Sequence, residues 1–376
     1  MIKNFFVRTA SIAAIAALAP VAAVHAQVTT SSARGVVTDS AGQAVAGATV
    51  TIVHEPTGTV TTATTGLNGQ YTAQNLRIGG PFSVTVTGEG VSASRVENVY
   101  TSLGDTSVVN IVTAAADDTA RLDTVVVTGA AQIAQVATGP SSTFNLATLE
   151  NSPAINRDVK DIIRLDPRVY IDPNAGGAAG SDGIQCAGAS TRYNSLTVDG
   201  VRLNDNFGLN TNGYPTERIP FSYDAIEQVS VELAPFDVLY GSFTACNINA
   251  VTKGGTNEIH GGLFYDYSSD ALTGDSTDGI ERDLGDFDEK RYGIHVGAPI
   301  IKDKLFIFGA YEKYEGANIF GQTSEDVGIS QALYDSIIAT AVNQYGYVSG
   351  GLPTSAAVED EKIFAKIDWN ITDTQR

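Results

Sequence analysis

The chain has 376 residues, and its 42 Asp and Glu outnumber its 23 Lys and Arg, giving a formal net charge of −19. Such an acidic chain lacks the basic surface that binding to nucleic acid phosphates requires, so we expect no nucleic acid partner. Fifteen Tyr and fourteen Phe stand beside one Trp and one Met, a composition that favours β structure. The length predicts two or three domains.

Residues 1–26 have the pattern of a secretory signal peptide. Lys3 and Arg8 supply the basic start, Ala10–Val24 is the apolar stretch, and Val24-His25-Ala26 is a small-residue cleavage site. No later run reaches the roughly eighteen apolar residues that a membrane-spanning helix requires. We therefore expect an exported protein in which any membrane crossing is made by strands.

Residues 27–113 predict a small antiparallel β-sandwich. Short alternating runs are separated by turns such as Asp39-Ser-Ala-Gly42 and Leu67-Asn-Gly69. Many short strands at this spacing are typical of such a sandwich. The expected strands are Gly35–Thr38, Ala48–Val53, Thr59–Thr65, Gln70–Ala73, Pro81–Thr87 and Ser107–Val112.

Three groups of residues in this unit resemble the carboxypeptidase regulatory-like domain, which has a transthyretin-type fold. They are Gly35-x-Val37-x-Asp39-x-x-Gly42, Val45-x-Gly47-Ala48-x-Val50 and Thr64-x-x-x-Asn68-Gly69-x-Tyr71. The resemblance implies a fold and no peptidase activity, because no zinc-ligand motif accompanies these residues.

A β-branched stretch, Leu122–Gly129, follows within a linker that we place at residues 114–138. Its three consecutive valines, Val125, Val126 and Val127, favour an extended backbone. Two interpretations are open at this point. The stretch is either the last strand of the preceding domain or a strand offered to the sheet edge of another protein.

Residues 139–257 combine a short helix, expected at Asn156–Leu165, with several strands. Tyr193–Val198 and Val201–Leu203 flank Asp199-Gly200, a strong signal for a two-residue β-hairpin. The further expected strands are Ile226–Leu233 and Asn247–Lys253.

Four motifs in this region resemble, in their order, the plug domain of TonB-dependent outer-membrane receptors. They are Val198-Asp199-Gly200-Val201, Tyr223-x-Ala225-Ile226-Glu227-x-Val229-x-Val231, Tyr240-Gly241 and Ile248-Asn249-x-Val251-Thr252-Lys253-x-Gly255-Thr256-Asn257. Ala245-Cys246 departs from the pattern, which commonly has small glycines there. A regulatory-like domain ahead of the plug resembles the Oar-like branch of the family. The candidate plug residues are Asp199, Gly200, Asn249, Thr252, Lys253 and Gly255.

The resemblance implies a role for the stretch Leu122–Gly129. In this family TonB binds an extended periplasmic segment by strand addition and transmits energy from the inner-membrane proton gradient. The candidate TonB-contact residues, called the coupling segment below, are Asp123, Thr124, Val125, Val126 and Val127. The position of the stretch at a domain junction favours this role over a last strand of the sandwich.

Residues 258–376 predict about four initial strands of a transmembrane antiparallel β-barrel. Their side chains alternate in polarity, and their connections alternate between long and short. The expected strands are Ile259–Ser268, Arg291–Ala298, Leu305–Glu315 and Lys362–Asn370. Aromatic side chains of the two rims are expected at Tyr265, Tyr267, Tyr292, Tyr314, Phe306 and Trp369. Because four strands cannot close a barrel in lipid, we expect a fragment or truncated product of a larger receptor. The alternative is a soluble antiparallel sheet.

Few residues suggest a disulfide, a catalytic site or a metal site. Cys186 and Cys246 could form a disulfide in an oxidising compartment, the alternative being two separate buried thiols. No catalytic motif or metal-ligand spacing occurs, so we expect neither an enzyme nor a cofactor or metal. Ser269–Lys290 contains eight acids, which fit a solvated external loop, with a divalent-cation site as the alternative.

The predicted protein is mainly β: a transthyretin-like sandwich, an α+β plug domain and the first strands of a barrel. We expect an outer-membrane receptor of a Gram-negative cell that takes up an unknown extracellular ligand, with its N-terminal domain in the periplasm. Its expected partners are TonB, outer-membrane lipid and that ligand. Two alternatives remain open: an outer-membrane adhesin or scaffold without transport, and a secreted two-domain binding protein.

Overall fold

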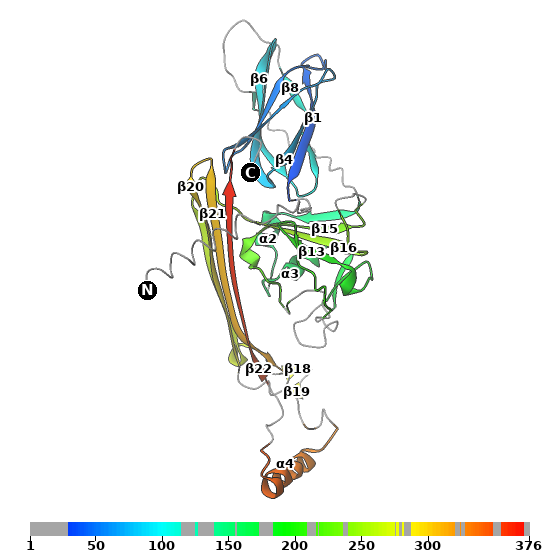
Figure 1. Cartoon of the computed structure of the whole chain (residues 1–376), viewed down its shortest axis with the longest axis vertical. Helices are drawn as coiled ribbons and strands as arrows, with labels where there is room; N and C mark the ends of the chain where they lie inside the picture. The colour runs from blue at the N-terminus through cyan, green and yellow to red at the C-terminus, as the bar shows by residue number, and fades with distance from the viewer. Residues whose placement is uncertain are drawn as a thin grey trace, which may run out of the picture.

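The computed structural model has three units: a β-sandwich, a small mixed domain and a sheet of long strands (Figure 1). Of residues 125–126, 276–277, 280–281, 318–319 and 355–356 the backbone alone is described. The described residues are 29–113, 125–126, 139–154, 156–172, 183–208, 216, 218–235, 240–274, 276–277, 280–281, 287–319, 324, 328–348 and 355–371.

The N-terminal unit is a sandwich of two sheets. One has the order β4-β1-β7, with β8 also paired to β1, and the other has the order β3-β2-β5-β6-β9. Inward-facing residues of both sheets, among them Val37, Val50 and Val84, form one buried core. The strands are β1 Ser31–Asp39, β2 Thr49–His54, β3 Thr59–Thr64, β4 Gln70–Leu76, β5 Gly79–Gly88, β6 Val91–Thr101, β7 Thr106–Val108, β8 Ile111–Thr113 and β9 Val125–Val126.

The residues that carry the regulatory-like resemblance have structural roles. A Cβ at Gly35 would lie 1.9 Å from the carbonyl oxygen of Val109, so only glycine fits there. The Tyr71 hydroxyl donates to that same carbonyl at 2.7 Å and is buried with it. In the first turn, the Asp39 carboxylate accepts from the N–H of Ala41 at 2.9 Å. The motif thus specifies turns and close packing.

Strand β6 was not expected from the sequence. Its Ser, Glu and Asn residues interrupt the alternation, and Asn98 has a positive φ of 58° that breaks the strand's regularity. Val96 and Val99 are nevertheless buried in the sandwich core. Pairing with β5 therefore outweighs the weak local preference, although the register shifts along the pair.

The second unit is built on a five-stranded sheet of order β10-β15-β16-β13-β14. Its central strand β16 is buried along its whole length. The elements are β10 Ser141–Phe144, α2 Leu146–Asn151, α3 Val159–Ile163, β11 Val169–Asp172, β12 Gly183–Cys186, η1 Thr191–Tyr193, β13 Ser195–Val198, β14 Val201–Arg202, η2 Tyr223–Ala225, β15 Ile226–Leu233 and β16 Cys246–Thr252.

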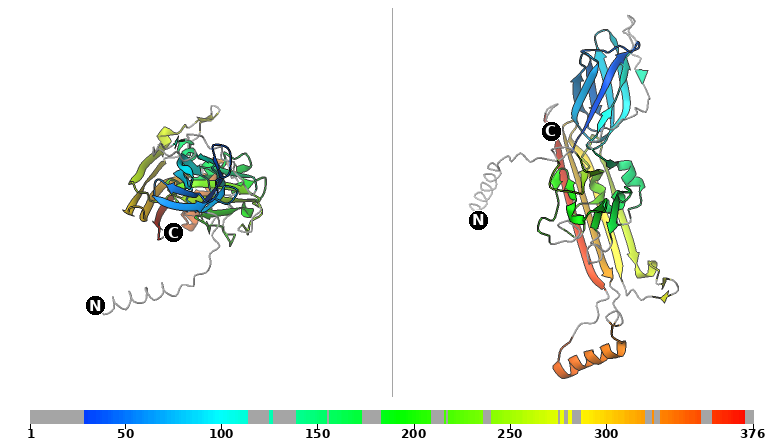
Figure 2. Two further views of the ribbon diagram at one scale, coloured as in Figure 1. Left: turned by 90° about the horizontal axis from the view of Figure 1, so that it is seen from above. Right: turned by 90° about the vertical axis from the view of Figure 1, so that its right-hand side faces the viewer.

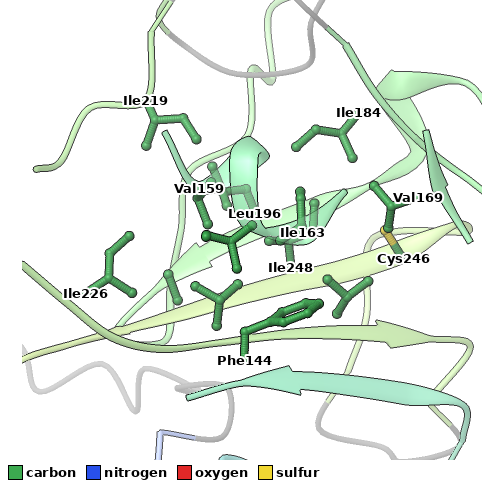
Figure 3. Close-up of a cluster of buried hydrophobic side chains, with 14 of the residues drawn as sticks. Phe144, Val159, Ile163, Val169, Ile184, Leu196, Ile219, Ile226, Cys246 and Ile248 are labelled. Atoms are coloured by element: carbon green, nitrogen blue, oxygen red, sulfur yellow. The ribbon is translucent and has the colours of Figure 1, made fainter. Parts of the chain in front are cut away.

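The core of this unit joins helix α3 to the sheet (Figure 3). Val159 and Ile163 from the helix lie above Leu196 and Ile248 from the two paired strands β13 and β16. Helix α3 is shorter than the expected Asn156–Leu165, because the Asp158 side chain accepts from the Lys160 N–H and caps it there.

The third unit, called the wall below, is an antiparallel sheet of order β17-β20-β21-β22. It runs alongside the second unit and has the sandwich at one end and helix α4 at the other (Figures 1 and 2). Strands β20, β21 and β22 are four to six residues longer than the sequence indicated, and β21 and β22 each have 15 residues. The elements are β17 His260–Ser269, η3 Asp270–Leu272, β18 Ser276–Thr277, β19 Ile280–Glu281, β20 Asp288–Ile301, β21 Leu305–Ile319, α4 Gln331–Tyr345 and β22 Ser355–Trp369.

The two faces of the wall differ. Its outward face exposes large apolar side chains, including Leu263, Ile294 and Ile363, as a lipid-facing surface does. Two expected rim aromatics were wrong: Phe306 is 0% exposed and Tyr314 is 6% exposed, and both are on the inward face. Leu305–Glu315 begins with consecutive apolar residues, so alternation alone could not separate its faces. No helix among the described residues is long and apolar enough to cross a membrane.

Candidate functional site

Two residues of the coupling segment lie in the described part of the chain. The backbones of Val125 and Val126 form β9, which pairs in parallel with Ser94 and Arg95 of β6. For these two residues, the structure therefore has the sandwich pairing that was the alternative interpretation. TonB contact stays a prediction. The other three residues, Asp123, Thr124 and Val127, lie outside the described residues.

The predicted hairpin at Asp199-Gly200 is present, and both residues have positive φ, 47° and 77°. The Asp199 carboxylate accepts from the N–H of Thr252 at 2.9 Å and also from the Thr252 hydroxyl. Lys366 of the wall donates to the Thr252 carbonyl at 3.0 Å and lies 3.6 Å from the Asp199 carboxylate. Two predicted plug residues therefore meet at a cation from the wall.

Two further predicted residues are held by internal contacts of the second unit. Asn249 is fully buried, and its side-chain oxygen accepts from the Thr197 hydroxyl at 2.9 Å. The N–H of Lys253 donates to the Ala225 carbonyl at 2.7 Å. The contact of Asn249 ties the middle of β16 to β13, and that of Lys253 ties the residue after β16 to η2, so both residues are structural in this unit.

Gly255 lies in close contact with the backbone of the wall. A Cβ at this position would lie 2.5 Å from the carbonyl oxygen of Ile307 and 2.8 Å from that of Ala298. Both atoms belong to the backbone of the β20–β21 hairpin, so they cannot move aside as a flexible side chain would. The glycine is required by packing against the wall.

Cys186 and Cys246 form the predicted disulfide, with their Cα atoms 5.9 Å apart. The bond joins the end of β12 to the first residue of the central strand β16. Both residues are buried, at 1% and 0% exposure. The bond therefore fixes the β11–β12 hairpin to the sheet.

A buried carboxylate of the wall connects to the second unit. Glu312 is 1% exposed and accepts from the Ser222 hydroxyl at 2.9 Å. Lys362 of the neighbouring strand lies 3.2 Å from the same carboxylate and 3.2 Å from Asp360. The buried charge is thus paired and hydrogen-bonded, as its burial requires.

A second cluster of charges crosses the same interface. Asp224 pairs with Arg157 within the second unit and lies 3.7 Å from His295 of the wall. The Arg157 guanidinium lies over the ring of Phe264 at 3.6 Å. Burial acts to raise the pKa of Asp224, but the nearby His295 ring and the Arg157 charge outweigh it and hold this pKa below its usual value.

The sandwich is attached to the second unit at what we call the seam, formed by Gln228, Thr101 and Leu103. The Gln228 side chain on β15 is 2% exposed. Its oxygen accepts from the Leu103 N–H at 3.0 Å, and its nitrogen donates to the Thr101 carbonyl at 3.2 Å. Nearby, Arg77 of the sandwich lies 3.9 Å from Asp368 of the wall.

Two acids lie beside the seam, Asp105 from the sandwich and Glu232 from β15. Each is less than 8% exposed. Burial raises the pKa of Asp105. Burial also raises the pKa of Glu232, against hydrogen bonds from Asn247 and Tyr240, and the Asp105 charge adds to the rise. The ionised form of each carboxyl group is therefore disfavoured at this interface.

A cavity of about 1010 Å³ lies where the three units meet. Its lining mixes charges of both signs, so it favours neither anionic nor cationic ligands. No three His, Cys, Asp or Glu side chains gather as metal ligands in the described ranges. Its titratable lining residues include Arg77, Glu227, Lys253, His260, His295 and Lys366.

Sequence reasoning missed the partners that the wall and the sandwich contribute. A usable signal existed for Lys362 and Lys366, which alternate with Ile363 and Ile367 along β22 and therefore share its inward face. No such signal existed for Gln228, because the sequence around one polar residue in an alternating strand does not indicate which distant groups it contacts.

Three family models match successive parts of the chain. Residues 32–114 match the carboxypeptidase regulatory-like domain, residues 134–246 the TonB-dependent receptor plug domain, and residues 251–325 an outer membrane beta barrel domain. The chain thus contains domains of these three kinds in this order, on a fold in which the second unit lies beside a sheet with an apolar outer face. The protein is accordingly an outer-membrane protein.

The chain is also similar to the TonB-dependent transporter Oar of Myxococcus xanthus. The two are 30% identical over 141 residues, which are 34% of this chain and 12% of the relative. The chain thus spans a small part of the length of that relative.

Two solved structures resemble parts of this chain. The transporter YddB from Escherichia coli is 16% identical, with a TM-score of 0.42 over 63% of this chain and 32% of that one. The siderophore receptor PirA from Acinetobacter baumannii is 21% identical, with a TM-score of 0.42 over 62% of this chain and 29% of that one.

Proposed function

We propose that this chain carries the energy-coupling and plug regions of a receptor that takes up an extracellular ligand. TonB adds as a strand to the coupling segment, Asp123–Val127, and pulling on that segment rearranges the plug. The proposal includes no catalytic step. The observation that carries it is the backbone of Val125 and Val126, which is extended and pairs with a sheet edge, as strand addition requires.

The short connection of the wall supports a periplasmic location for the sandwich. β20 and β21 are joined by a tight turn at Lys302–Lys304, and barrels of this class have short turns on the periplasmic side. Asp303 of this turn contacts Gly58 of the sandwich closely, and the Asn257 N–H donates to the Pro56 carbonyl at 2.8 Å. The sandwich and the coupling segment then lie in the periplasm.

The plug's contacts with the wall indicate where rearrangement would begin. The Asp199–Thr252 pair, which Lys366 holds, lines the same cavity as His54 and Arg77 of the sandwich, close to where a periplasmic pull arrives. Lys366 is partly exposed and its contacts are polar, so water can replace them as the plug moves. These contacts can therefore break and re-form during a transport cycle.

The proposal is tested by proline in the coupling segment. Val126→Pro in the full-length receptor removes a backbone N–H and is expected to lower binding of the purified TonB C-terminal domain at least tenfold. Val126→Thr keeps the β-branched side chain and the N–H, and should bind as the wild type does. Equal binding of the proline variant would refute the coupling assignment. Absence of TonB binding by the wild type would favour a non-transporting adhesin or scaffold.

A further inference from the structure

Strand β6 lies between two different neighbours. On one side it pairs with β5 inside the sandwich sheet, and on the other with β9, whose residues belong to the coupling segment. The Cα partners are Ser94 with Val125 and Arg95 with Val126. Without β9, β6 would present an unpaired edge in a sheet of order β3-β2-β5-β6. Such an edge is a ready template for an added strand.

The other end of β6 is anchored to the plug. β6 ends at Thr101, whose carbonyl accepts from the Gln228 side chain, and the Leu103 N–H just beyond it donates to the same side chain. The sandwich is also tied to the wall through Arg77 and Asp368. The edge that holds Val125 and Val126 therefore belongs to a body attached to both the plug and the wall.

We propose that the β6 edge is a docking site in cis for the coupling segment, and that it competes with TonB. This inference rests on the proposed function, because it concerns the same segment. In the docked state Val125 and Val126 are paired with the receptor's own sheet. The productive state requires their release from β6.

The competition between the β6 edge and productive TonB coupling follows from which part of the receptor bears tension on the coupling segment. While Val125 and Val126 are paired with β6, tension on them is borne by the sandwich, and through the seam and Arg77–Asp368 by the plug and wall together. The first plug strand, β10, is then pulled together with the rest of the plug and with the wall, so the load does not separate it from them. Only a released coupling segment passes tension along the chain to Ser141, where β10 begins.

The docking is weak enough to be reversible. Within the part of the chain that the structure describes, two residue pairs connect β6 to β9, in a parallel arrangement. One net backbone hydrogen bond changes an equilibrium by up to about tenfold. A pairing this short therefore shifts TonB affinity by about three- to thirtyfold, a range in which TonB can displace it.

The test is a disulfide across the pair in the full-length receptor. Arg95→Cys and Val126→Cys place thiols on register partners, whose separation in a β pair suits a disulfide. The native Cys186 and Cys246 are buried and already bonded, so they leave the new pair as the reactive one. The matched controls are the two single variants under the same oxidising treatment. Binding of the purified TonB C-terminal domain is measured for these three variants and for the wild type.

The expected result is a disulfide that forms readily and lowers TonB affinity at least tenfold relative to both single variants. A disulfide that does not form would overturn the docking. A disulfide that forms while TonB affinity stays equal or rises would overturn the competition, because the edge would then present the segment. Absence of TonB binding by both single variants, and by the wild type, would overturn the proposed function and this inference with it.

Discussion

The plug contacts its two neighbours through different chemistry. Toward the wall the contacts involve ionised groups, whereas toward the sandwich the central contact is a neutral amide at the seam. The wall contacts are Ser222 with Glu312 at 2.9 Å, Asp224 with His295 at 3.7 Å and Asp199 with Lys366 at 3.6 Å. The sandwich contact is Gln228 with Leu103 at 3.0 Å and Thr101 at 3.2 Å.

This difference implies that the two interfaces respond to different conditions. Charge pairs between partly hydrated groups weaken with salt and with protonation, so the wall contacts are adjustable. The amide of Gln228 does not titrate, and its two bonds are insensitive to salt. The plug is thus held toward the wall by charged contacts that salt can loosen, and toward the sandwich by a central contact that itself neither titrates nor weakens with salt.

The largest expected effect is on the wall side. Lys362→Met leaves the 1% exposed Glu312 without its nearest cation, and breaking a buried pair in this way costs about 3–5 kcal/mol. The urea midpoint of plug unfolding in the full-length receptor should fall accordingly. Lys313→Met on the same wall is the control, because its partner Glu315 is partly exposed and such pairs contribute about 1 kcal/mol or less. Equal midpoints for the two variants would contradict the prediction.

The next effect is at the seam. Gln228→Leu leaves the buried Leu103 N–H and Thr101 carbonyl without partners, at a cost of about 1–3 kcal/mol each. Amide exchange at Leu103 should accelerate while exchange in the plug core stays unchanged. Gln43→Leu, an exposed substitution on the sandwich, should leave the Leu103 amide as slow as in the wild type. If Leu103 exchange is unaltered in Gln228→Leu, the Gln228 side chain does not hold the sandwich to the plug.

A smaller effect is expected from a methyl group between plug and wall. Gly255→Ala places a Cβ 2.5 Å from the Ile307 carbonyl oxygen, and such overpacking costs about 1–3 kcal/mol. Gly241→Ala is the matched control, because nothing lies within 4 Å of its Cβ. Protease accessibility of the plug should rise in the first variant alone. If both variants resist protease equally, the close approach at Gly255 is unimportant.

The smallest expected effect is a difference between the two interfaces in how their stability changes with pH. The raised pKa values of Asp105 and Glu232 impose a cost at neutral pH that is relieved as pH falls toward about 4, so mild acid strengthens the seam. The lowered pKa of Asp224 gives stability that is complete above about 4 and is lost as pH falls further, so stronger acid weakens the wall contact. Amide exchange on both sides between pH 7 and 3 measures this. Glu232→Gln should reduce the seam's response, and an unchanged response would contradict its cause.

The sequence by itself determined the features that depend on neighbours along the chain. The Asp199-Gly200 hairpin follows from two residues that tolerate positive φ, and the inward face of β22 follows from alternation. The disulfide was foreseeable from compartment and cysteine count, with separate thiols as the alternative. These signals also ordered the sandwich, the plug and the first wall strands, because each unit has its own short motifs.

The tertiary structure decided which distant residues meet. Gln228 bonds to groups 125 and 127 residues away, and Lys366 bonds to Thr252, 114 residues away, so no local pattern marks these pairs. Phe306 and Ile307 are equally apolar, and only packing against the plug placed Phe306 inward. Likewise, the three valines predicted an extended strand without naming its partner. The fold supplied β6 for Val125 and Val126, because an unpaired edge lay within reach.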